Sequence, residues 1–368
     1  MTDKKTDEFF MSEAIKLALK GLYSVHPNPM VGAVIVKGGR IIGKGYHKEY
    51  GKAHAEINAM KGAKESLKGA IIYVTLEPCS TYGKTPPCTE ALRKAGIRRV
   101  VVGATDCNPA HSGKGLKILK KSGIKVKTGV LKKSCEDINL PFNKFMKQKI
   151  PYVTLKVSQS FDGRIADFMG RSRWISSLES RIHTHKLRAE ADAVLAGIET
   201  ILKDNPMLNI RHLKVKKQPV IVIVDSSLRI NVKAKVLENE RVIIAATQKA
   251  SKIKIARLEK RGIKILILSK DKNGRVNLKS LLKKLAQMNI GHVFVEGGGK
   301  VLGSFISQGL ADRFIGFFSP LIIGGEKSKS SVVWPDILNK GRKDLGIKMV
   351  FKSIKPIGPD IMFEAIFL

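Results

Sequence analysis

The sequence predicts an α/β protein of two domains, and three observations lead to this expectation. The chain has 368 residues, which is about twice the length of a common domain. Hydrophobic residues make up 43% of it and charged residues 27%, a composition typical of globular proteins. In both halves, short apolar runs of strand length alternate with stretches of helical period.

The first half carries predicted elements in the order αββαβαβ. Ser12 can cap a helix that runs to about Gly21. Two apolar runs that follow are separated by a glycine turn, which predicts a hairpin. The expected strands cover 31–36, 40–45, 70–76 and 100–104, and further helices begin at Ala53 and cover 89–94. This order describes a compact α/β layer domain.

The boundary between the predicted domains falls near residue 148. The segment 139–151 has prolines towards both ends and no clean period, which is typical of a connection. We therefore expect one domain over 1–148 and a second over 149–368. The second has predicted helices over 178–190 and 281–288 and predicted strands over 152–158, 193–196, 219–224, 241–246, 264–268, 292–295 and 313–318.

The formal charge of +36 is the most unusual property of the composition. Clustered Lys and Arg would neutralise phosphates and bind nucleic acid. Here the lysines are spread along the chain and aromatic residues make up only 6%, so we favour a solvated basic surface and expect no specific nucleic-acid partner. The longest apolar runs are far shorter than the roughly 20 residues that span a bilayer, so no membrane association is expected. Four cysteines in 368 residues indicate a reducing compartment, and the cytoplasm is the expected location.

Three short pieces of the first half have the residue types of a catalytic metal site: His54-Ala55-Glu56, Pro78-Cys79 and Cys88. One His and two Cys would hold Zn²⁺ and leave the fourth tetrahedral position open for water. The metal would lower the pKa of this water to near 7, and Glu56 would move its proton to a leaving amine, as in zinc deaminases. Pro78 favours a helix start at Cys79, where the helix N-terminus would favour the thiolate.

Each of these residues also has a structural interpretation when it is taken alone. His54 could lie at the surface, Glu56 could be an acid at a helix start, and both cysteines could be buried small residues. The set in this order favours the metal site. Cys107 and Cys135 have no metal-like spacing, and we interpret both as structural.

The first half resembles the deaminase half of the bifunctional riboflavin-biosynthesis deaminase/reductases in the segments HPNPMVGAVIV, HAE and EPCSTYGKTPPC. Other zinc deaminases usually carry P-C-x-x-C, whereas eight residues separate the two cysteines here. The resemblance implies a cytidine-deaminase-like α/β/α layer domain and substrate contacts at Asn28, His47 and Lys84. Thr81 departs from the family pattern, which commonly has His there, so the imidazole contact is lost.

A glycine run, Gly297-Gly298-Gly299, follows the predicted strand over 292–295 and leads into a predicted helix. Such glycines let backbone N–H groups approach a pyrophosphate at the helix N-terminus. The dinucleotide fingerprint G-x-G-x-x-G fails at its last position, Leu302, so a Rossmann domain is not supported. Taken alone, the run also fits an ordinary tight turn.

The second half resembles the reductase half of the same family, a dihydrofolate-reductase-like domain, in VTLKVSQSFDGRIA, RSRWIS, LRAEADAVLAGIETILKDNPMLNIR, VDSSLR and VEGGG. The resemblance thus covers nearly the whole chain in the order of the family. It implies NADPH contacts at Ser158, Trp174, Thr200, Asp204, Ser226, Gly298, Gly299, Lys300, Val301, Leu302, Gly303 and Ser304. It implies substrate contacts at Ser172, Arg188, Leu208, Arg211 and Glu296. The two arginines can grip a phosphate and Trp174 offers a flat surface to a cofactor ring, although core packing and solvated cations would equally explain these residues.

The resemblance implies two reactions. The first unit would deaminate 2,5-diamino-6-(5-phosphoribosylamino)pyrimidin-4(3H)-one at one zinc ion. The second would use NADPH to reduce the ribosyl group of 5-amino-6-(5-phosphoribosylamino)uracil to ribityl. The family also implies a homo-oligomer. The proton donor of the reduction stays open between Glu296 and water.

Two alternatives remain from the sequence. The charge motivates a nucleic-acid-binding protein on a deaminase fold, which would leave the nucleotide-site motifs unexplained. Thr81 motivates an enzyme in which one half has lost activity.

Overall fold

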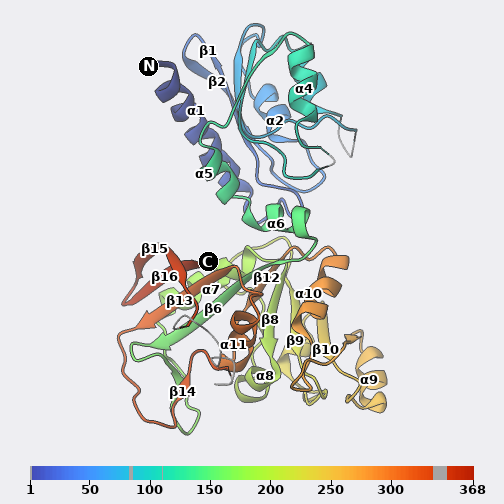
Figure 1. Ribbon diagram of the computed structural model, residues 1–368, viewed down its shortest axis with the longest axis vertical. Helices are drawn as coiled ribbons and strands as arrows, with labels where there is room; N and C mark the ends of the chain where they lie inside the picture. The colour runs from blue at the N-terminus through green and yellow to red at the C-terminus, as the bar shows by residue number, and fades with distance from the viewer. Residues whose placement is uncertain (1, 83–85, 110, 335–345) are drawn as a thin grey trace. The chain divides into compact units, whose positions relative to one another are not determined.

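The computed structural model describes residues 2–82, 86–109, 111–334 and 346–368. The chain divides into two compact units, Met1–Lys149 and Ile150–Leu368 (Figure 1). No helix in the described part of the chain is long and apolar enough to cross a membrane.

Unit 1 is built on a five-stranded sheet of order β2-β1-β3-β4-β5 in its described residues. Strands β3, β4 and β5 are parallel, and β1 is antiparallel to both of its neighbours. The strands are β1 (Gly32–Lys37), β2 (Arg40–Tyr46), β3 (Ile71–Leu76), β4 (Arg99–Ala104) and β5 (Lys125–Thr128). The helices are α1 (Thr2–Ala18), η1 (Leu19–Gly21), α2 (Ala55–Lys61), α3 (Cys88–Lys94), α4 (Lys114–Lys121), α5 (Lys132–Asp137) and α6 (Leu140–Gln148).

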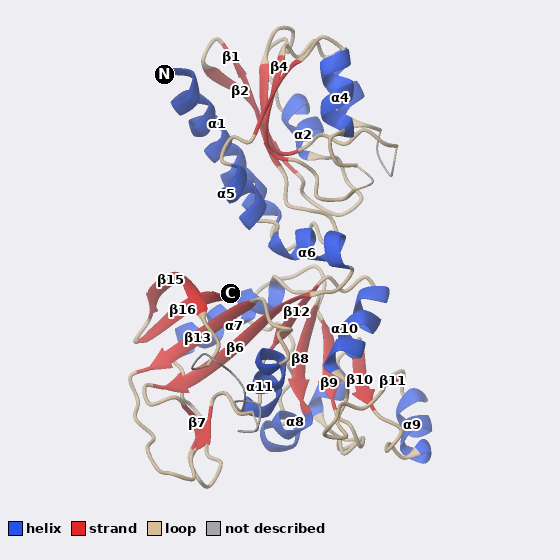
Figure 2. Cartoon of the chain, viewed as in Figure 1, coloured by secondary structure: helices blue, strands red, loops and turns tan. Residues whose placement is uncertain are grey.

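Helices cover both faces of this sheet (Figure 2). On one face, Met11 of α1 and Cys135 of α5 pack against alternate residues of the central strands. On the other face, Ala59 of α2, Leu92 of α3 and Leu119 of α4 do so. A sheet covered on both faces explains the nearly continuous apolar runs of β1, β3 and β4.

The predicted αββαβαβ order is confirmed, and two of its boundaries are corrected. The first helix begins at Thr2 rather than Ser12, whose hydroxyl donates to the carbonyl of Phe9 at 2.7 Å and caps nothing. The segment 139–151, which was expected to be an irregular connection, contains helix α6. Pro141 is compatible with this helix because it stands in the first turn, where no N–H donor is required. The sequence reasoning also missed α4, β5 and α5.

Unit 2 is built on a nine-stranded sheet of order β11-β10-β9-β8-β12-β6-β13-β16-β15 within the described residues. The strands of this sheet are β6 (Tyr152–Ser160), β8 (Ala193–Gly197), β9 (Val220–Val224), β10 (Val242–Ala246), β11 (Lys264–Ile267), β12 (His292–Val295), β13 (Arg313–Ser319), β15 (Met349–Ile357) and β16 (Asp360–Phe367). A small sheet pairs β7 (Arg164–Ala166) with β14 (Lys329–Ser330). The helices are α7 (Leu178–Ala189), α8 (Ile198–Asp204), η2 (Lys235–Glu238), α9 (Lys252–Glu259), α10 (Leu278–Gln287) and α11 (Gly299–Ser307).

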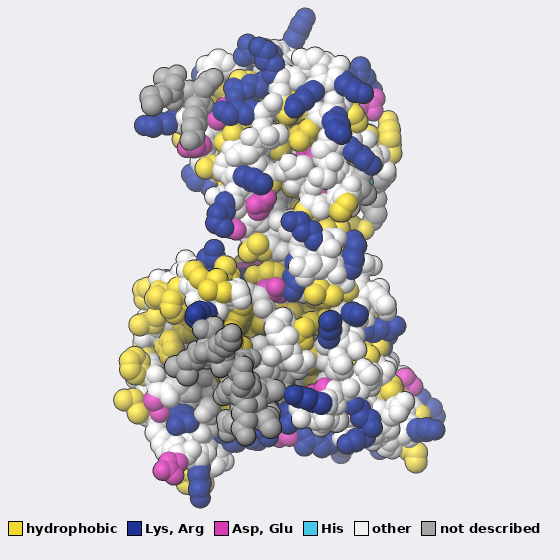
Figure 3. All heavy atoms as spheres, in the orientation of Figure 1, with side chains coloured by type: hydrophobic (Ala, Val, Ile, Leu, Met, Phe, Trp, Pro, Cys, Tyr) yellow, Lys and Arg dark blue, Asp and Glu magenta, His cyan; other side chains and the backbone are white. Residues whose placement is uncertain are grey.

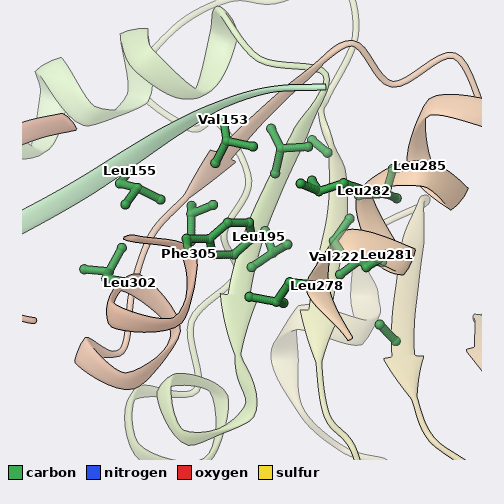
Figure 4. Close-up of a cluster of buried hydrophobic side chains, with 14 of the residues drawn as sticks. Val153, Leu155, Leu195, Val222, Leu278, Leu281, Leu282, Leu285, Leu302 and Phe305 are labelled. Atoms are coloured by element: carbon green, nitrogen blue, oxygen red, sulfur yellow. The ribbon is translucent and has the colours of Figure 1, made fainter. Parts of the chain in front are cut away.

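The core of unit 2 also has two layers. Figure 4 shows one of them, in which Leu281 and Leu285 of α10 and Phe305 of α11 meet Leu195 and Val222 of the sheet. Side chains of α7, α8 and α9 form the second layer on the opposite face. The seven strands predicted for this half are all present, whereas β15 and β16 at the sheet edge were not predicted.

The strands from β11 to β13 are parallel. The chain runs outward from β8 through β9 and β10 to β11, while β12 and β6 lie on the other side of β8. Ligands of open α/β sheets bind at such a reversal of strand order, outside the carboxyl ends of the strands. The glycine run lies there, because it follows β12.

Candidate active sites

Unit 1 brings His54, Cys79 and Cys88 together. Their ligand atoms all lie within 4.8 Å of one another. The Nδ1 atom of His54 is 3.4 Å from Cys79 Sγ and 3.3 Å from Cys88 Sγ. In a tetrahedral zinc site, two ligand atoms of these types are about 3.6 Å apart. The types of the three residues and the distances between their ligand atoms therefore fit zinc.

The ends of two short helices position these ligands. His54 is the N-cap residue of α2, which begins at Ala55 and so two residues later than the sequence predicted. The expectation of a helix start at Cys79 is wrong: Cys79 lies in a loop, and helix α3 begins at Cys88, after Pro87. The N–H of Cys88 nevertheless donates to Cys79 Sγ at 3.3 Å. Hydrogen bonds from Cys88 and His54 hold the pKa of Cys79 well below its usual value, which favours the thiolate that a metal requires.

Glu56 lies in the first turn of α2, next to the metal-ligand cluster. Its side chain is buried. Burial, followed by the charge of Cys79, raises the pKa of Glu56 to about 7. A carboxyl group of this kind can hold or release a proton close to the open position of the site.

Asn28 and His47 form a pair beside the cluster. His47 Nδ1 lies 3.2 Å from the carbonyl oxygen of Ala53, to which it donates, so Nε2 accepts from Asn28 Nδ2 at 3.0 Å. Burial lowers the pKa of His47, which favours the neutral form of the ring. The rings of His47 and His54 meet edge to face, with centroids 5.4 Å apart. The amide of Asn28 is thereby held in one orientation.

The other predictions for unit 1 have mixed outcomes. Thr81 is exposed, and Lys84 lies outside the described residues. Cys135 is buried against Gly103, where it packs as a small apolar residue. Burial raises the pKa of Cys107, and neither of these two cysteines belongs to the cluster that the described residues form.

Sequence reasoning missed Glu77, which precedes Pro78. Its carboxylate accepts the backbone N–H groups of Asp106, Gly113 and Gly115 at 3.2, 2.9 and 3.0 Å. Glu77 therefore ties the loop that carries Cys79 to the loop after β4. The only signal for it in the sequence was its place beside the Pro-Cys pair.

Unit 2 contains a cavity of about 1250 Å³ at the carboxyl ends of its parallel strands. This volume exceeds that of a pocket for one drug-sized ligand, so the cavity has room for a dinucleotide and a second molecule. Every residue predicted for the cofactor or the substrate of this half lines it, except Gly303. A side chain at Gly303 would collide with the backbone of Val333, so this glycine is required for packing.

The glycine run turns the chain from β12 into α11. Gly297 and Gly298 have φ of 107° and 62°, a left-handed region that favours glycine. Gly298 is the N-cap of α11, and it lines the cavity together with Gly299 and Lys300 of the first turn, where the backbone N–H groups have no partner within the helix. The run thus has the geometry of an anion site and is more than an ordinary turn.

Two residues of the wall show that the cavity suits a polar, partly aromatic ligand. The hydroxyl of Ser158 is buried and has no hydrogen-bond partner among the described residues, so it is free for a ligand atom. The ring of Trp174 is 69% exposed and lies 4.0 Å from the guanidinium of Arg181. A flat exposed ring in a cavity is suited to stacking against a cofactor ring.

Arg188 and Glu296 form a buried ion pair, which the sequence did not suggest. Arg188 donates through Nε and Nη2 to the two carboxylate oxygens, with Nη2 2.9 Å from Oε2, and through Nη1 to the carbonyl of Asn209 at 2.6 Å. Most donors of Arg188 are therefore engaged. Arg211 is exposed and contacts Asn209 Oδ1 through Nη1 at 3.2 Å, which leaves further guanidinium donors for a phosphate.

Lys156 of β6 also lines the cavity, and sequence reasoning missed it. Burial lowers the pKa of Lys156 to about 8, although the charge of Glu296 opposes this. Its Nζ lies 5.5 Å from the ring centroid of Phe317. In a chain rich in lysine, the sequence carries no sign that this lysine is buried.

The comparisons with known proteins agree with both sites. Residues 4–104 match the model of the cytidine and deoxycytidylate deaminase zinc-binding region, and residues 151–363 match the RibD C-terminal domain. The riboflavin biosynthesis protein RibD of Aquifex aeolicus is 43% identical over 96% of this chain and 94% of its own length. The RibD structure of Acinetobacter baumannii, form 1, is 36% identical with a TM-score of 0.89 over 99% of both chains. A diaminohydroxyphosphoribosylaminopyrimidine deaminase/5-amino-6-(5-phosphoribosylamino)uracil reductase structure from Thermotoga maritima is 36% identical with a TM-score of 0.84 over 100% of both chains. The zinc cluster in one unit, the nucleotide cavity in the other and these matches together show that the chain belongs to the RibD family of bifunctional riboflavin-biosynthesis deaminase/reductases.

Proposed function

We propose that unit 1 deaminates 2,5-diamino-6-(5-phosphoribosylamino)pyrimidin-4(3H)-one and that unit 2 reduces the ribosyl group of the resulting uracil derivative with NADPH. The observation that carries the proposal is the presence, in one chain of this family, of a His/Cys/Cys cluster with a buried carboxyl group beside it and a separate cavity with a glycine-lined helix N-terminus.

In the deamination, water replaces the 2-amino group and ammonia leaves. His54, Cys79 and Cys88 would hold a zinc ion, which would supply an activated water at neutral pH. Glu56 accepts the proton of the attacking water and delivers it to the departing nitrogen. Asn28 presents its amide to the pyrimidine edge, and His47 holds that amide in place. Lys84 contacts the phosphoribosyl group.

In the reduction, hydride adds to C1′, the bond between C1′ and the ring oxygen breaks, and that oxygen takes a proton. The cofactor supplies the hydride. We propose Lys156 as the proton donor, because it is a partly buried lysine in the cavity wall with a pKa of about 8. Glu296, held by Arg188, orients the substrate, and Arg211 binds its phosphate together with Ser172 and Leu208 along the same wall.

The cofactor would lie along the glycine run. The residues from Gly298 to Ser304 are proposed to hold the pyrophosphate, with Gly303 acting through packing. Trp174 and Ser158 would contact the nicotinamide half, Thr200 and Asp204 the adjoining ribose, and Ser226 the adenosine half.

The purified, zinc-loaded full chain tests both steps. We expect exchange of an amino group for an oxygen without NADPH, and a further gain of two hydrogens with it, as read by mass spectrometry. Exchange of the amino group without a gain of two hydrogens in the presence of NADPH would contradict the reductase assignment. Reduction of the uracil intermediate without deamination of its precursor would contradict the deaminase assignment and favour loss of the first activity.

The proposal includes a homo-oligomer and a cytoplasmic location. Strand β15 ends the large sheet, and Phe351, Ile354 and the neighbouring Ile361 are 62%, 63% and 50% exposed. An exposed apolar sheet edge favours pairing with a second copy. Sedimentation of the wild type as a dimer or larger, and of Phe351→Lys as a monomer, is the expected result; a monomeric wild type would contradict it. The four free cysteines are compatible with a reducing compartment.

The nucleic-acid alternative gains no support from the surface that Figure 3 shows. Lys and Arg side chains are scattered over that face of both units and do not gather in one stripe. Tight binding of RNA or DNA at physiological salt would revive this alternative.

A further inference from the structure

The cavity of unit 2 has an end that the reaction does not use. Lys156 and Glu296 belong to β6 and the end of β12, whereas the loop 225–230 follows β9, on the far side of β8. The carboxyl ends of β6 and β9 are three strand spacings apart, about 14 Å. The start of α11 lies between them, because α11 follows β12. A dinucleotide with its pyrophosphate at α11 and its reactive ring near Lys156 therefore extends its adenosine towards the loop after β9.

Basic side chains gather at this adenosine end. Arg229 and Arg275 both line the cavity. A methyl group built on Gly274, which also lines it, would lie 3.3 Å from Lys249 Nζ. Arg229 and Arg275 thus contribute to the wall of the cavity, and Lys249 lies beside the turn that carries Arg275.

The carboxylates nearby are already engaged. Glu199 pairs with Arg229 at 2.6 Å. Asp271 lies in the same turn as Arg275, and its Oδ1 accepts the backbone N–H groups of Asn273 and Arg275 at 2.8 and 2.9 Å. Within the described part of the chain, the side chain of Arg275 makes no ion pair. Its positive charge is therefore available to an anion in the cavity.

Hydrogen bonds hold the two loops of this end together. The N–H of Val276 donates to Ser226 Oγ at 3.0 Å, and the N–H of Asp271 donates to the carbonyl of Arg275 at 2.7 Å. Asp225 Oδ2 accepts the N–H of Ile230 at 2.8 Å and closes the loop after β9. Arg275 is thus attached to a turn fixed beside Ser226, the residue proposed to contact adenosine.

We propose that Arg275, assisted by Lys249 and Arg229, binds the 2′-phosphate of NADPH and makes the reductase unit select NADPH over NADH. This inference rests on the proposed reductase function. A phosphomonoester carries a charge of about −1.5 to −2 at neutral pH, whereas NADH offers only a hydroxyl at this position. Sites that select NADH commonly place a free carboxylate there; here Glu199 is paired with Arg229, and the carboxylate of Asp271 accepts N–H groups of its own turn.

Direct binding tests the proposal without any turnover. Adenosine 2′,5′-bisphosphate and 5′-AMP differ only in the 2′-phosphate, and calorimetry with the zinc-loaded full chain gives a Kd for each. We expect the wild type to bind the bisphosphate at least about tenfold more tightly than 5′-AMP, since hydrogen bonds to charged groups contribute about 1.5–3 kcal/mol. Arg275→Gln should remove most of this preference and change the Kd of 5′-AMP less than about twofold.

Lys272→Gln is the matched control. Lys272 lies in the same turn, carries the same charge and is exposed, but it does not line the cavity. It should leave both Kd values unchanged, and an unchanged melting temperature of both variants will show that the turn is intact. The ratio of the Kd of 5′-AMP to that of the bisphosphate measures the preference for the 2′-phosphate. An equal fall of this ratio in both variants would overturn the proposal, because a general loss of positive charge would then explain the fall.

Two further outcomes separate this inference from the proposed function. Equal affinity of the wild type for the two nucleotides would overturn the proposal of a 2′-phosphate subsite, but it would not contradict the proposed nucleotide site. Binding of neither nucleotide, or of NADPH, would contradict the reductase function itself.

Discussion

The guanidinium of Arg188 donates two hydrogen bonds to the carboxylate of Glu296, one to each oxygen, although 108 residues separate the two partners in the chain. Arg188 comes from α7 and Glu296 follows β12. Burial alone would raise the pKa of Glu296, but the charge and hydrogen bonds of Arg188, with the charge of Lys156, hold it below its usual value. The cavity wall thus places a carboxylate whose ionised form is favoured near the partly buried Lys156.

Removing one partner of this pair should cost stability. Arg188→Met leaves Glu296 buried without its counter-charge, and we expect unit 2 to lose about 3 kcal/mol of unfolding free energy. The double variant Arg188→Met/Glu296→Leu removes both charges and should recover most of the loss. Both tryptophans, Trp174 and Trp334, belong to unit 2, so urea unfolding followed by tryptophan fluorescence measures this unit. A double variant less stable than the single one would refute the explanation.

Loss of a metal ligand should separate the two activities. Cys88→Ser is expected to lower the zinc content, measured by elemental mass spectrometry, and to abolish deamination, because one of three ligands is lost. Reduction of the uracil intermediate should persist, because unit 2 has its own core. Cys107→Ser is the control, since Cys107 is not part of the cluster. Full zinc occupancy in Cys88→Ser would show that the cluster is not the metal site.

The proposed role of Lys156 predicts a pH dependence of the reduction. The donor must be protonated, so the rate should fall as the pH rises through about 8, the pKa of Lys156. Lys156→Met should lower the reduction rate about 100-fold or more and leave deamination unchanged. Lys156→Arg keeps the charge but does not release a proton in this range, so it should preserve NADPH binding without restoring the rate. A wild-type rate that is constant from pH 7 to 9 would contradict the proposal.

Asp7 should stabilise unit 1 in a pH-dependent way. It is buried, accepts from Tyr73 at 2.8 Å, and pairs with Arg99 at 2.8 Å and Lys127 at 2.7 Å. Burial would raise the pKa of Asp7, but these partners together lower it. The contribution is therefore fully present above about pH 4 and is lost as the pH falls through the lowered pKa. Asp7→Asn should cost about 2 kcal/mol at neutral pH and little at pH 2.

Hydrogen exchange of peptides from α1 and β3 measures this local stability. Glu13→Gln is the control on the same helix, because Glu13 pairs with the exposed Lys16 and Lys44, and exposed pairs contribute under about 1 kcal/mol. Equal protection in Asp7→Asn and wild type at neutral pH would show that the buried pair does not anchor α1.

The sequence alone determined the alternation of strands and helices, the two halves and the zinc ligands. Strands covered on both faces are continuous apolar runs, which stand out in any sequence. The metal site was recognisable because zinc accepts few side-chain types, and their order with Glu56 and Pro78 is characteristic of the chemistry. The glycines before α11 were visible for a similar reason, since only glycine readily adopts the backbone of that turn.

The tertiary structure decided what depends on burial and on distant partners. Lys156 is one cation among many in the sequence, and only its place on β6 inside the cavity lowers its pKa. The ion pair of Arg188 with Glu296 likewise depends on packing, because 108 residues separate the two partners in the chain. Cys79 lies in a loop beside the start of the helix that begins nine residues later at Cys88, whose N–H donates to Cys79 Sγ. Pattern reveals local backbone preference and ligand type, whereas ion pairing, desolvation and access to a cavity arise only when separate segments pack together.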